Sequence, residues 1–274
     1  MKKDMHIHTT WSDGDKSEKE ICKLIKENNI KRFAITDHDT INGDKALFAN
    51  KELMEDLKAN GISVVSGIEV SSINDGIKMH ILGYGFDLNA KEINEMAEEL
   101  TRARQLKKEK LLSHLKDNFG IVLKEENIKE LDKNNTVGKP HIAKILIKEG
   151  YAESVKDAIV RYFKDFKHKD SKIPAERTIK NIHASGGIAV LAHPKEIMND
   201  YNLKYKDIKK ILKKLVGYGL DGIEINHSLH TLKDSKKFKY FAKHFHLVCS
   251  EGSDYHGESV KPNVHIGVCK YQPY

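Results

Sequence analysis

Two histidines near the N-terminus, His6 and His8, are the first residues whose type and spacing point to chemistry. They lie two positions apart in a segment expected to be a β-strand, so both imidazoles project from one face and can bind one metal ion. A chance pair of polar strand residues is the alternative. Asp13 and the run Thr36-Asp37-His38-Asp39 follow expected strands in the same way, and this repetition favours a metal site.

Five more acids and imidazoles occur near expected strands: Glu69, His80, His193, Asp254 and His256. The ends of parallel strands and the loops after them build the active site of α/β barrels, so these side chains are expected to converge. Each histidine alone is more often structural than functional. Nine acids and imidazoles in equivalent places favour one common site.

The chemistry of this set is nitrogen and oxygen ligation without thiolate, which suits manganese, iron or zinc. The three cysteines show no CxxC spacing, so neither a thiolate zinc site nor a disulfide framework is predicted. Ions that share carboxylates can activate water and neutralise a phosphoryl group, as in phosphatases and nucleases. The sequence has no Gly-rich phosphate loop, G-x-S-x-G elbow or dinucleotide fingerprint. A metal-dependent phosphoesterase is therefore predicted.

The elements that must position these residues form two series in which strands alternate with helices. In the first, strands are expected at 4–7, 32–36 and 62–70, and helices at 17–28 and 44–60. In the second, strands are expected at 187–192, 221–226 and 247–250, and helices at 203–216 and 231–244. This alternation implies parallel strands with helices outside them, which predicts a closed or nearly closed α/β barrel.

Residues 87–172 separate the two series and read as charged helices, at 90–118, 124–131, 141–149 and 154–166. The predicted organisation is a barrel whose first part is 1–86, a helical insertion at 87–172, and a second barrel part at 173–274.

Composition restricts the partners. The formal charge of +7 fits an anionic substrate or nucleic acid, although alternating lysine and glutamate at 90–116 is typical of a solvated helix face. No apolar run approaches the roughly 20 residues that span a bilayer, so no membrane partner is expected. The N-terminal Met-Lys-Lys-Asp-Met-His lacks the apolar segment of a secretory signal, which predicts a cytoplasmic protein. No obligate protein partner is evident.

Several of these segments resemble the ordered motifs of the polymerase and histidinol phosphatase (PHP) superfamily. They are Asp4-Met-His-Ile-His-Thr, Ser12-Asp-Gly, Thr36-Asp-His-Asp, Gly67-Ile-Glu-Val-Ser, Leu191-Ala-His-Pro and Gly252-Ser-Asp-Tyr-His-Gly. The similarity runs almost end to end. Asp37-His-Asp-Thr, Gly138-Lys-Pro-His-Ile-Ala and the stretch from Gly186 to Pro194 further resemble the branch that contains nucleoside 3′,5′-bisphosphate phosphatase and the 5′→3′ exoribonuclease RNase AM.

The resemblance implies a distorted (β/α)7 barrel with a helical insertion capping its mouth, and two or three divalent ions, with manganese favoured over iron or zinc. Carried over motif by motif, the first ion would be held by His6, His8, Glu69 and Asp254. The second would be held by Asp13, His38 and His256, and the third by Glu69, His80 and His193. Glu69 would bridge ions, and a metal-activated hydroxide would attack phosphorus. Glu69, Asp254 and His193 are the implied catalytic residues.

Substrate contacts are expected from Lys139, His141, Arg177 and His227. The branch usually has Gly-Arg-Pro-His where this chain has Gly138-Lys139-Pro140-His141, and lysine lacks the planar two-point grip of arginine on phosphate. Arg177 would supply that grip instead, whereas surface charge is the alternative reading for both Lys139 and Arg177. The remaining histidines are expected to be structural or exposed: His114, His168, His183, His230, His244, His246 and His265.

The predicted function is hydrolysis of phosphate esters of nucleotides, either 3′,5′-bisphosphate nucleotides or the 5′ ends of short RNA. Histidinol phosphate phosphatase shares the metal motifs and is the first alternative, which the insertion motif and the basic balance disfavour. A non-catalytic PHP module that binds nucleic acid is the second, which the filled ligand positions disfavour.

Overall fold

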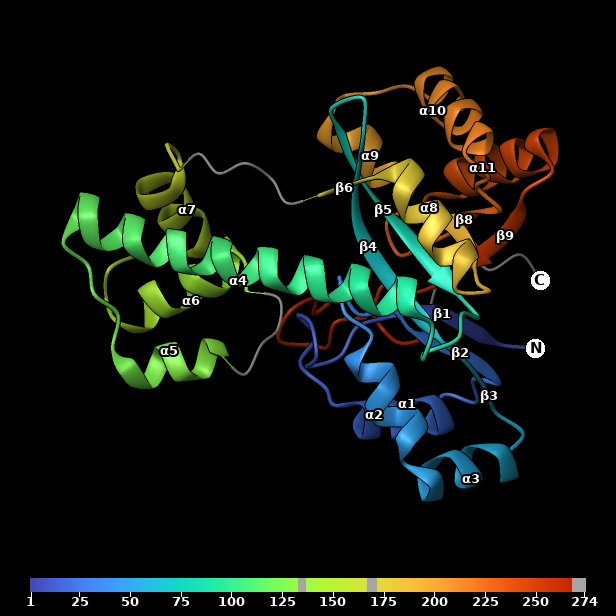
Figure 1. Cartoon of the computed structure of the whole chain (residues 1–274), viewed down its shortest axis with the longest axis horizontal. Coiled ribbons are helices and arrows are strands. Elements are labelled where there is room, and N and C mark those ends of the chain that lie inside the picture. Colours follow the sequence, from blue (N-terminus) through green and yellow to red (C-terminus); the bar gives the residue numbers. More distant parts are fainter. Residues whose placement is uncertain (133–136, 167–171, 268–274) are drawn as a thin grey trace. The chain divides into compact units, whose positions relative to one another are not determined.

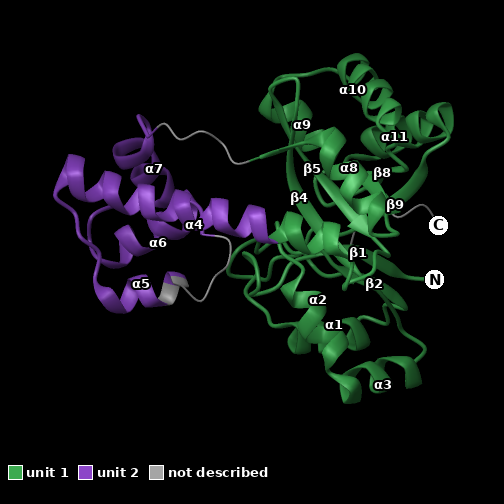
Figure 2. Ribbon diagram, viewed as in Figure 1, with its two compact units in different colours: residues 1–97, 172–274 green, residues 98–171 purple. Residues whose placement is uncertain are grey.

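The computed structural model describes residues 1–132, 137–166 and 172–267. The chain divides into two compact units, one of residues 1–97 and 172–274, the other of residues 98–171 (Figure 2). The first unit is an α/β fold and the second is helical, so the helical character expected for the middle of the chain is confirmed. The boundary falls within helix α4 (Lys91–Phe119), whose first turns belong to the first unit.

The first strand and helix series forms a three-stranded parallel sheet in the order β1-β2-β3. Its elements are β1 (Lys3–Ile7), α1 (Glu18–Glu27), β2 (Arg32–Ile35), α2 (Asn42–Ala49), α3 (Lys51–Ala59) and β3 (Ser63–Val65). Ser17 and Glu20 begin α1 with a capping box, which satisfies two backbone N–H groups at the helix start. The single helix expected at 44–60 is wrong, because Asn50 ends α2 and its side chain caps α3 by accepting a hydrogen bond from the N–H of Leu53.

The remaining strands form a six-stranded sheet in the order β6-β4-β5-β7-β8-β9 (Figure 1). Its strands are β4 (Gly67–Asn74), β5 (Ile77–Tyr84), β6 (Ile173–Pro174), β7 (Ile188–Leu191), β8 (Gly222–Asn226) and β9 (Val248–Glu251). Its helices are α8 (Ala175–Ala184), α9 (Pro194–Asp200), α10 (Tyr205–Gly217) and α11 (Leu232–Phe245). The parallel pairs β7·β8 and β8·β9 confirm the second predicted series.

One part of the sheet differs from the parallel prediction. The strand expected at 62–70 is two strands, β3 and β4, and β4 turns back through Asp75 and Gly76 into β5, which the sequence analysis missed. Both turn residues have positive φ, 49° and 78°, the conformation of the tight turns that join antiparallel strands. β5 is therefore antiparallel to both β4 and β7. Helices α8 and α9 were also missed.

The two sheets touch at two places. Ile7 at the end of β1 bridges to Tyr255, just beyond β9, and His38 beyond β2 bridges to Glu69 in β4. Backbone hydrogen bonds accompany both bridges, from the N–H of Asp254 to the carbonyl of His6 and from the N–H of Glu69 to the carbonyl of Asp37. The three-stranded sheet is thus hydrogen-bonded to the six-stranded sheet on both sides, next to the segments that carry the metal-binding motifs.

Each unit has its own apolar core. In the first, Ile21 and Ile25 of α1 pack with Phe33 of β2 and with Tyr255, all nearly inaccessible to solvent. In the second, α4 packs with α5 (Glu125–Asp132), α6 (Lys139–Lys148) and α7 (Val155–Phe163). Phe163 is fully buried there. Among the described helices, none combines the length and apolar character of a membrane span.

Candidate metal centre

Glu69 of β4 lies at the middle of a group of imidazoles and is completely buried. Its Oε2 atom is 3.2 Å from Nε2 of His6, 3.1 Å from Nε2 of His8 and 3.1 Å from Nδ1 of His38. His6 belongs to β1 and His8 follows it, whereas His38 follows β2, so three segments meet at one oxygen atom.

The other oxygen atom of Glu69 faces a different pair of imidazoles. Oε1 lies 3.0 Å from Nδ1 of His80 and 2.8 Å from Nε2 of His193. His80 is in the middle of β5 rather than near a strand end, and it reaches the site because antiparallel pairing sets it opposite Ser71, on the face that carries Glu69. The carboxylate of Glu69 is therefore shared by two sets of ligand atoms.

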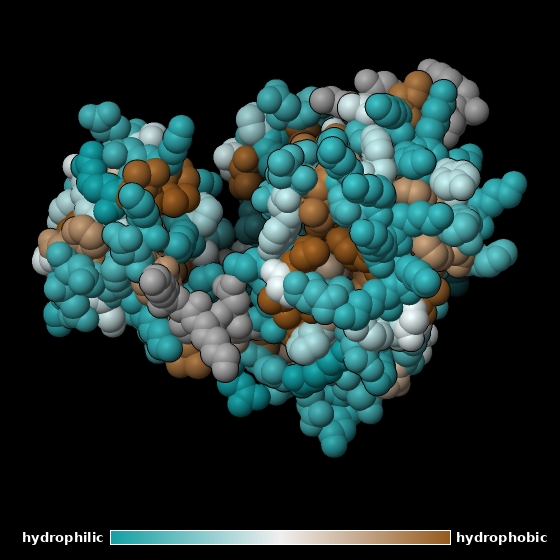
Figure 3. Space-filling model, turned by 90° about the horizontal axis from the view of Figure 1, so that it is seen from above, coloured by the Kyte–Doolittle hydropathy of each residue, from teal (hydrophilic) through white to brown (hydrophobic). Residues whose placement is uncertain are grey.

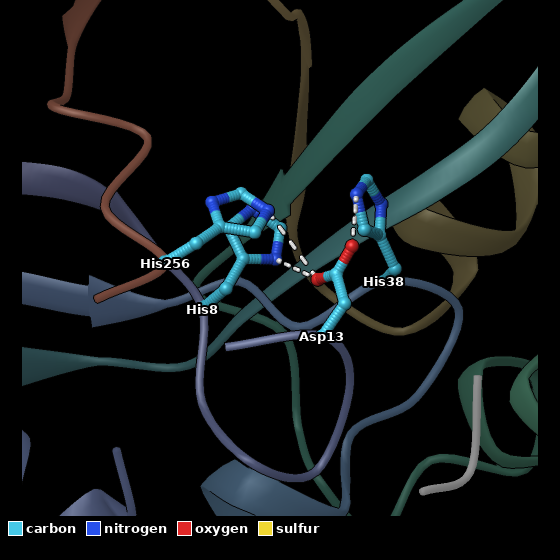
Figure 4. Close-up of side chains that lie close together, drawn as sticks. All are labelled: His8, Asp13, His38 and His256. Atoms are coloured by element: carbon cyan, nitrogen blue, oxygen red, sulfur yellow. Dashed lines mark ion pairs between the residues drawn. The ribbon is translucent and has the colours of Figure 1, made fainter. Parts of the chain in front are cut away.

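Two further carboxylates complete the cluster. Oδ1 of Asp254 lies 3.5 Å from Nε2 of His6 and 3.3 Å from Nε2 of His8. Asp13 lies between imidazoles on either side (Figure 4): its Oδ1 is 3.3 Å from Nε2 of His256, and its Oδ2 is 3.8 Å from Nε2 of His38. All nine residues expected from the sequence thus lie together, within the first unit.

The buried atoms of this cluster fit bound cations. Among the described residues, Nε2 of His6, Nε2 of His8, Nδ1 of His38 and Oε2 of Glu69 have no hydrogen-bond partner. Leaving such groups buried and unpaired is costly, so a native structure needs a partner for them. The ligand atoms lie close enough to hold ions in overlapping sets, among them His6, His8, Glu69 and Asp254; His8, Asp13, His38 and His256; and His38, Glu69 and His80.

Outer partners fix which nitrogen of several imidazoles faces the cluster. Nδ1 of His6 lies 3.1 Å from Oε1 of Glu224 and donates to it, which leaves the Nε2 lone pair for a cation. Nδ1 of His193 lies 2.7 Å from Oε2 of Glu196. Nδ1 of His256 donates to the backbone carbonyl of Asp254 at 2.9 Å. With its proton on the outward nitrogen, each of these imidazoles can offer the lone pair of its inward nitrogen to a cation.

Close backbone packing and left-handed backbone conformations support these positions. A Cβ atom at Gly14 would lie 2.6 Å from the carbonyl oxygen of His8, and one at Gly252 would lie 2.6 Å from the backbone nitrogen of His6. Only glycine allows such approach. Asp254 and His193 have φ values of 58° and 20°, conformations that surrounding structure must hold in place.

The carboxylates and imidazoles of the cluster shift one another's pKa values strongly, in the directions expected where negative carboxylates are buried together. Burial alone would raise the pKa of Glu69, but the imidazoles of His38, His80 and His6 outweigh it and hold this pKa well below its usual range. Burial alone would lower the pKa of His6, yet Glu69, Glu224 and Asp254 raise it well above its usual value. Burial lowers the pKa of His38 to about 3, so this imidazole is neutral and able to coordinate.

The four expected substrate contacts lie in different surroundings. His227 is in the cluster: its Nδ1 accepts from the N–H of Leu229, so its Nε2 carries the proton and points at Oδ2 of Asp254, 3.2 Å away. Arg177 is exposed on α8, whose Thr178 contacts Ser72, and Ser72 lies on the face of β4 opposite Glu69.

Lys139 and His141 belong to the second unit and have partners there. Lys139 donates from Nζ to the carbonyl of Phe163, and Nδ1 of His141 accepts from the N–H of Gly138 at the start of α6. Substrate binding by these residues and by Arg177 stays a prediction.

Of the other histidines, His230 is buried beside His227. The other described histidines lie away from the ligand atoms. His114 and His183 contact Tyr162 and Asp221, respectively. His244, His246 and His265 are exposed, and His168 lies outside the described residues.

Sequence reasoning missed three residues that contact the cluster: Glu196, Glu224 and Lys261. Glu224 carried a usable signal, because it is a lone acid between two isoleucines in an apolar strand and is fully buried. Asp37 accepts from the N–H of Thr9 and from the Ser12 hydroxyl, which fixes the loop after His8. Lys261 donates from Nζ to Oδ2 of Asp254 at 2.5 Å, and nothing near it in the sequence marks it.

Relatives of known activity cover nearly the whole chain. A phosphoribosyl 1,2-cyclic phosphate 1,2-diphosphodiesterase from Eggerthella lenta is 33% identical over 94% of this chain and 95% of its own length. A 5′-3′ exoribonuclease from Haemophilus influenzae is 30% identical over 93% of this chain and 90% of its own. A 3′,5′-nucleoside bisphosphate phosphatase from Chromobacterium violaceum is 26% identical over 92% and 86%.

A solved structure of an amidohydrolase from Chromobacterium violaceum shares the fold. It superposes with a TM-score of 0.81 at 23% identity and covers all of this chain and 92% of its own. The sequence model of the PHP domain matches residues 4–228, a span that contains seven of the nine clustered residues. The resemblance stated from the motifs is confirmed: this chain belongs to the PHP domain family and is a hydrolase of phosphate esters.

Proposed function

We propose that this protein is a metal-dependent phosphoesterase that acts on the terminal phosphates of nucleotides, with the 5′ ends of short RNA and 3′,5′-bisphosphate nucleotides as substrates. The observation that carries the proposal is the convergence of five imidazoles on the two oxygen atoms of one buried carboxylate, Glu69, at 2.8–3.2 Å. Without bound cations, so many buried polar atoms lacking hydrogen-bond partners would destabilise the folded protein.

The ligand sets support up to three ions. His6, His8, Glu69 and Asp254 would hold one; Asp13, His38 and His256 a second; and Glu69, His80 and His193 a third. The donor set of nitrogen and oxygen atoms suits manganese, with iron and zinc as the other candidates. When bound, divalent ions supply a water of lowered pKa and positive charge that offsets the charge of the phosphoryl oxygens.

The residues of the chain arrange the reacting groups. Glu69 offers one oxygen atom to each side of the cluster and would contribute a ligand to an ion on each side. Oδ1 of Asp254 faces the cluster, while its Oδ2 is held by the N–H of His227 and the ammonium of Lys261, which sets the orientation of the carboxylate. The Lys261 side chain is partly exposed, 37%, so its ammonium is placed to bind a phosphoryl oxygen of the substrate.

Two predictions about architecture belong to the same proposal. The bridges Ile7 to Tyr255 and His38 to Glu69 support a ring of seven strands, β1, β2, β4, β5, β7, β8 and β9, which is a distorted (β/α)7 barrel. The helical second unit would cap its mouth and bring Lys139 and His141 to the substrate. A cytoplasmic location agrees with these substrates.

A second candidate function has a specific observation in its favour. The relative that is 33% identical is named for hydrolysis of a cyclic phosphate diester of phosphoribose. The same ion cluster can open a cyclic phosphate, since the attacking group and the phosphoryl oxygens are alike in both reactions. The two candidates differ in whether the substrate carries a nucleobase and a terminal phosphate.

The test is a comparison of kcat/KM for manganese-loaded protein on four substrates: a short 5′-phosphorylated RNA, a 3′,5′-bisphosphate nucleoside, phosphoribosyl 1,2-cyclic phosphate and histidinol phosphate. We expect kcat/KM to be highest for the two nucleotide substrates. A Glu69→Gln variant under the same conditions serves as the background for contaminating phosphatases. Preference for the cyclic sugar phosphate would replace the proposal by the second candidate, and preference for histidinol phosphate would refute both.

A further inference from the structure

The positive charge of this protein is concentrated on two adjacent helices, α10 and α11. Together they carry ten lysines and two aspartates, a formal charge of +8, whereas the whole chain carries +7. The rest of the chain therefore has a formal charge of −1. The lysines are Lys206, Lys209, Lys210, Lys213 and Lys214 in α10, and Lys233, Lys236, Lys237, Lys239 and Lys243 in α11.

This charge is not compensated locally. Within the described part of the chain, Lys214 alone of the ten forms an ion pair, with Asp75. The two aspartates are already used: Asp234 is buried and accepts from the hydroxyl of Tyr205 at 2.6 Å, and Asp207 caps the start of α10 by accepting from the N–H of Lys204. Lysines gathered on two adjacent helices with few acidic partners attract polyanions.

The surface beside these two helices has a depression. Tyr205 at the start of α10 and Leu232, Lys233, Lys236 and Lys237 of α11 line an open depression of about 620 Å³. The Tyr205 ring is partly exposed, and its hydroxyl bond to Asp234 holds it in one orientation. Hydrophilic side chains cover most of the surface that is seen from above in Figure 3. An aromatic ring beside several ammonium groups is the combination by which proteins bind single-stranded nucleic acid, through base stacking and phosphate contacts.

Residues that line the depression or contact its lining are only a few positions in the sequence from residues of the metal centre. His227, which contacts Asp254, is five residues before Leu232, and five residues of extended chain reach at most about 18 Å. A second link runs through Lys195, which pairs with Asp234 at 3.7 Å and follows His193 by two residues. Both links lie inside the first compact unit, so the depression and the ion cluster keep a fixed relation.

We propose that the depression between α10 and α11 is a binding site for single-stranded RNA, which holds nucleotides downstream of the one whose phosphate is in the metal centre. The proposal rests on the proposed function, because it supposes an RNA substrate with its 5′ end at the ions. The lysines bind successive phosphates, and the Tyr205 ring stacks on a base. Such a site separates a polymeric substrate from a mononucleotide, which is too short to reach it.

The test measures binding and cleavage separately. The probe is a 5′-phosphorylated single-stranded RNA of about 12 nucleotides with a fluorophore at its 3′ end, within the usual site size of such surfaces. Its first linkages are phosphorothioates, which resist cleavage, and its Kd is measured by anisotropy with manganese-loaded protein. The variant is Lys233→Glu/Lys236→Glu, and the matched control is Lys51→Glu/Lys58→Glu, two exposed lysines of α3 with the same change of charge. Turnover of 4-nitrophenyl phosphate by manganese-loaded protein reports the metal centre.

We expect the α11 variant to raise the Kd for the RNA at least tenfold and to reduce the slope of log Kd against log salt by about 1.4, since each single-strand phosphate contact contributes about 0.7. Its turnover of 4-nitrophenyl phosphate should stay at the wild-type value. The control should change Kd by less than about twofold, because its charges are screened at this distance. Tyr205→Ala should weaken RNA binding without changing the salt slope.

Three results would overturn the site: an unchanged Kd in the α11 variant, an equal loss in the control, or wild-type binding of vesicles of anionic phospholipid that exceeds binding of RNA and depends on the same lysines. Failure of the proposed function has a different signature. If the wild type cleaves none of the nucleotide substrates while its RNA binding still depends on Lys233 and Lys236, the function is wrong and the RNA site stands.

Discussion

Replacing Glu224 by glutamine tests whether this β8 acid, which the sequence analysis did not select, orients the ligands of the metal centre. Glu224 is fully buried, and both its oxygen atoms accept: Oε1 from Nδ1 of His6 at 3.1 Å and Oε2 from the backbone N–H of His193 at 2.8 Å. Two groups of candidate ligands therefore depend on one side chain, because His6 and His193 belong to different groups.

Glutamine has the same shape but only one acceptor. If its oxygen atom stays on the N–H of His193, its amide group faces His6 and forces the His6 proton from Nδ1 to Nε2, the nitrogen that must bind the ion. If the amide is reversed, two N–H groups oppose each other at His193, whose φ of 20° already needs support. Loss of such an outer partner typically costs 10–100-fold in metal affinity, or about 1.4–2.7 kcal/mol.

The assay is a titration of metal-free protein with manganese or zinc in competition with a chromophoric chelator, so the result does not depend on turnover. We expect Glu224→Gln to raise the metal Kd at least tenfold. Glu251→Gln is the matched control, since Glu251 lies on the neighbouring strand β9 and contacts Lys3 and Asn226 rather than the cluster. A metal Kd for a folded Glu224→Gln protein within twofold of wild type, or an equal loss in the control, would refute the reasoning.

Other substitutions test the rest of the account. Glu69→Gln should lower both metal occupancy, measured by elemental analysis, and turnover, because the amide lacks the charge that offsets neighbouring cations; wild-type values would remove Glu69 from the site. Chelation of bound ions should lower Tm, since ions present at about 100 times their Kd stabilise a protein by about 2.7 kcal/mol; an unchanged Tm in calorimetry would contradict a folded-state ion cluster. Lys139→Ala or Arg177→Ala should reduce kcat/KM for a bisphosphate nucleotide more than for 4-nitrophenyl phosphate; equal losses would place these residues at the reacting phosphate, and no change would leave them as surface charge. Phe163→Ala should destabilise the second unit by about 3–5 kcal/mol without changing metal affinity, and coincident loss of metal in native-state titrations would show that the units do not fold separately.

The parts of the fold that sequence reasoning predicted are those with a local pattern. The segments around β1, β2, β7, β8 and β9 have short apolar runs separated by amphipathic helices, and that alternation specifies parallel pairing. The β4 and β5 hairpin was not predicted: β3 and β4 were read as one strand at 62–70, because only Ser66 separates them, and β5 was not expected at all. Asp75-Gly76 followed by alternating apolar and polar residues at 77–81 is a hairpin signal that the sequence analysis did not use.

The site divides in the same way. His6 and His8 were found because two histidines two positions apart on a strand share one face. Most of the others were found because they lie near expected strand ends, and His80 is the exception, since it lies in the middle of β5. Glu224 escaped because its importance lies in a contact with His6, 218 residues away in the chain. Lys261 escaped because it lies in an irregular segment after the last strand, where a lysine is usually solvent-exposed.

The bridge between Ile7 and Tyr255 has a consequence for how the protein folds. The first ligand set joins His6 and His8 to Asp254, which lies 246 positions after His8 in the chain. Contacts of such large sequence separation close a long loop and tend to form late in folding. The metal centre is therefore completed only after β1 and the segment beyond β9 have come together, and a partly folded chain in which they are apart has no working centre.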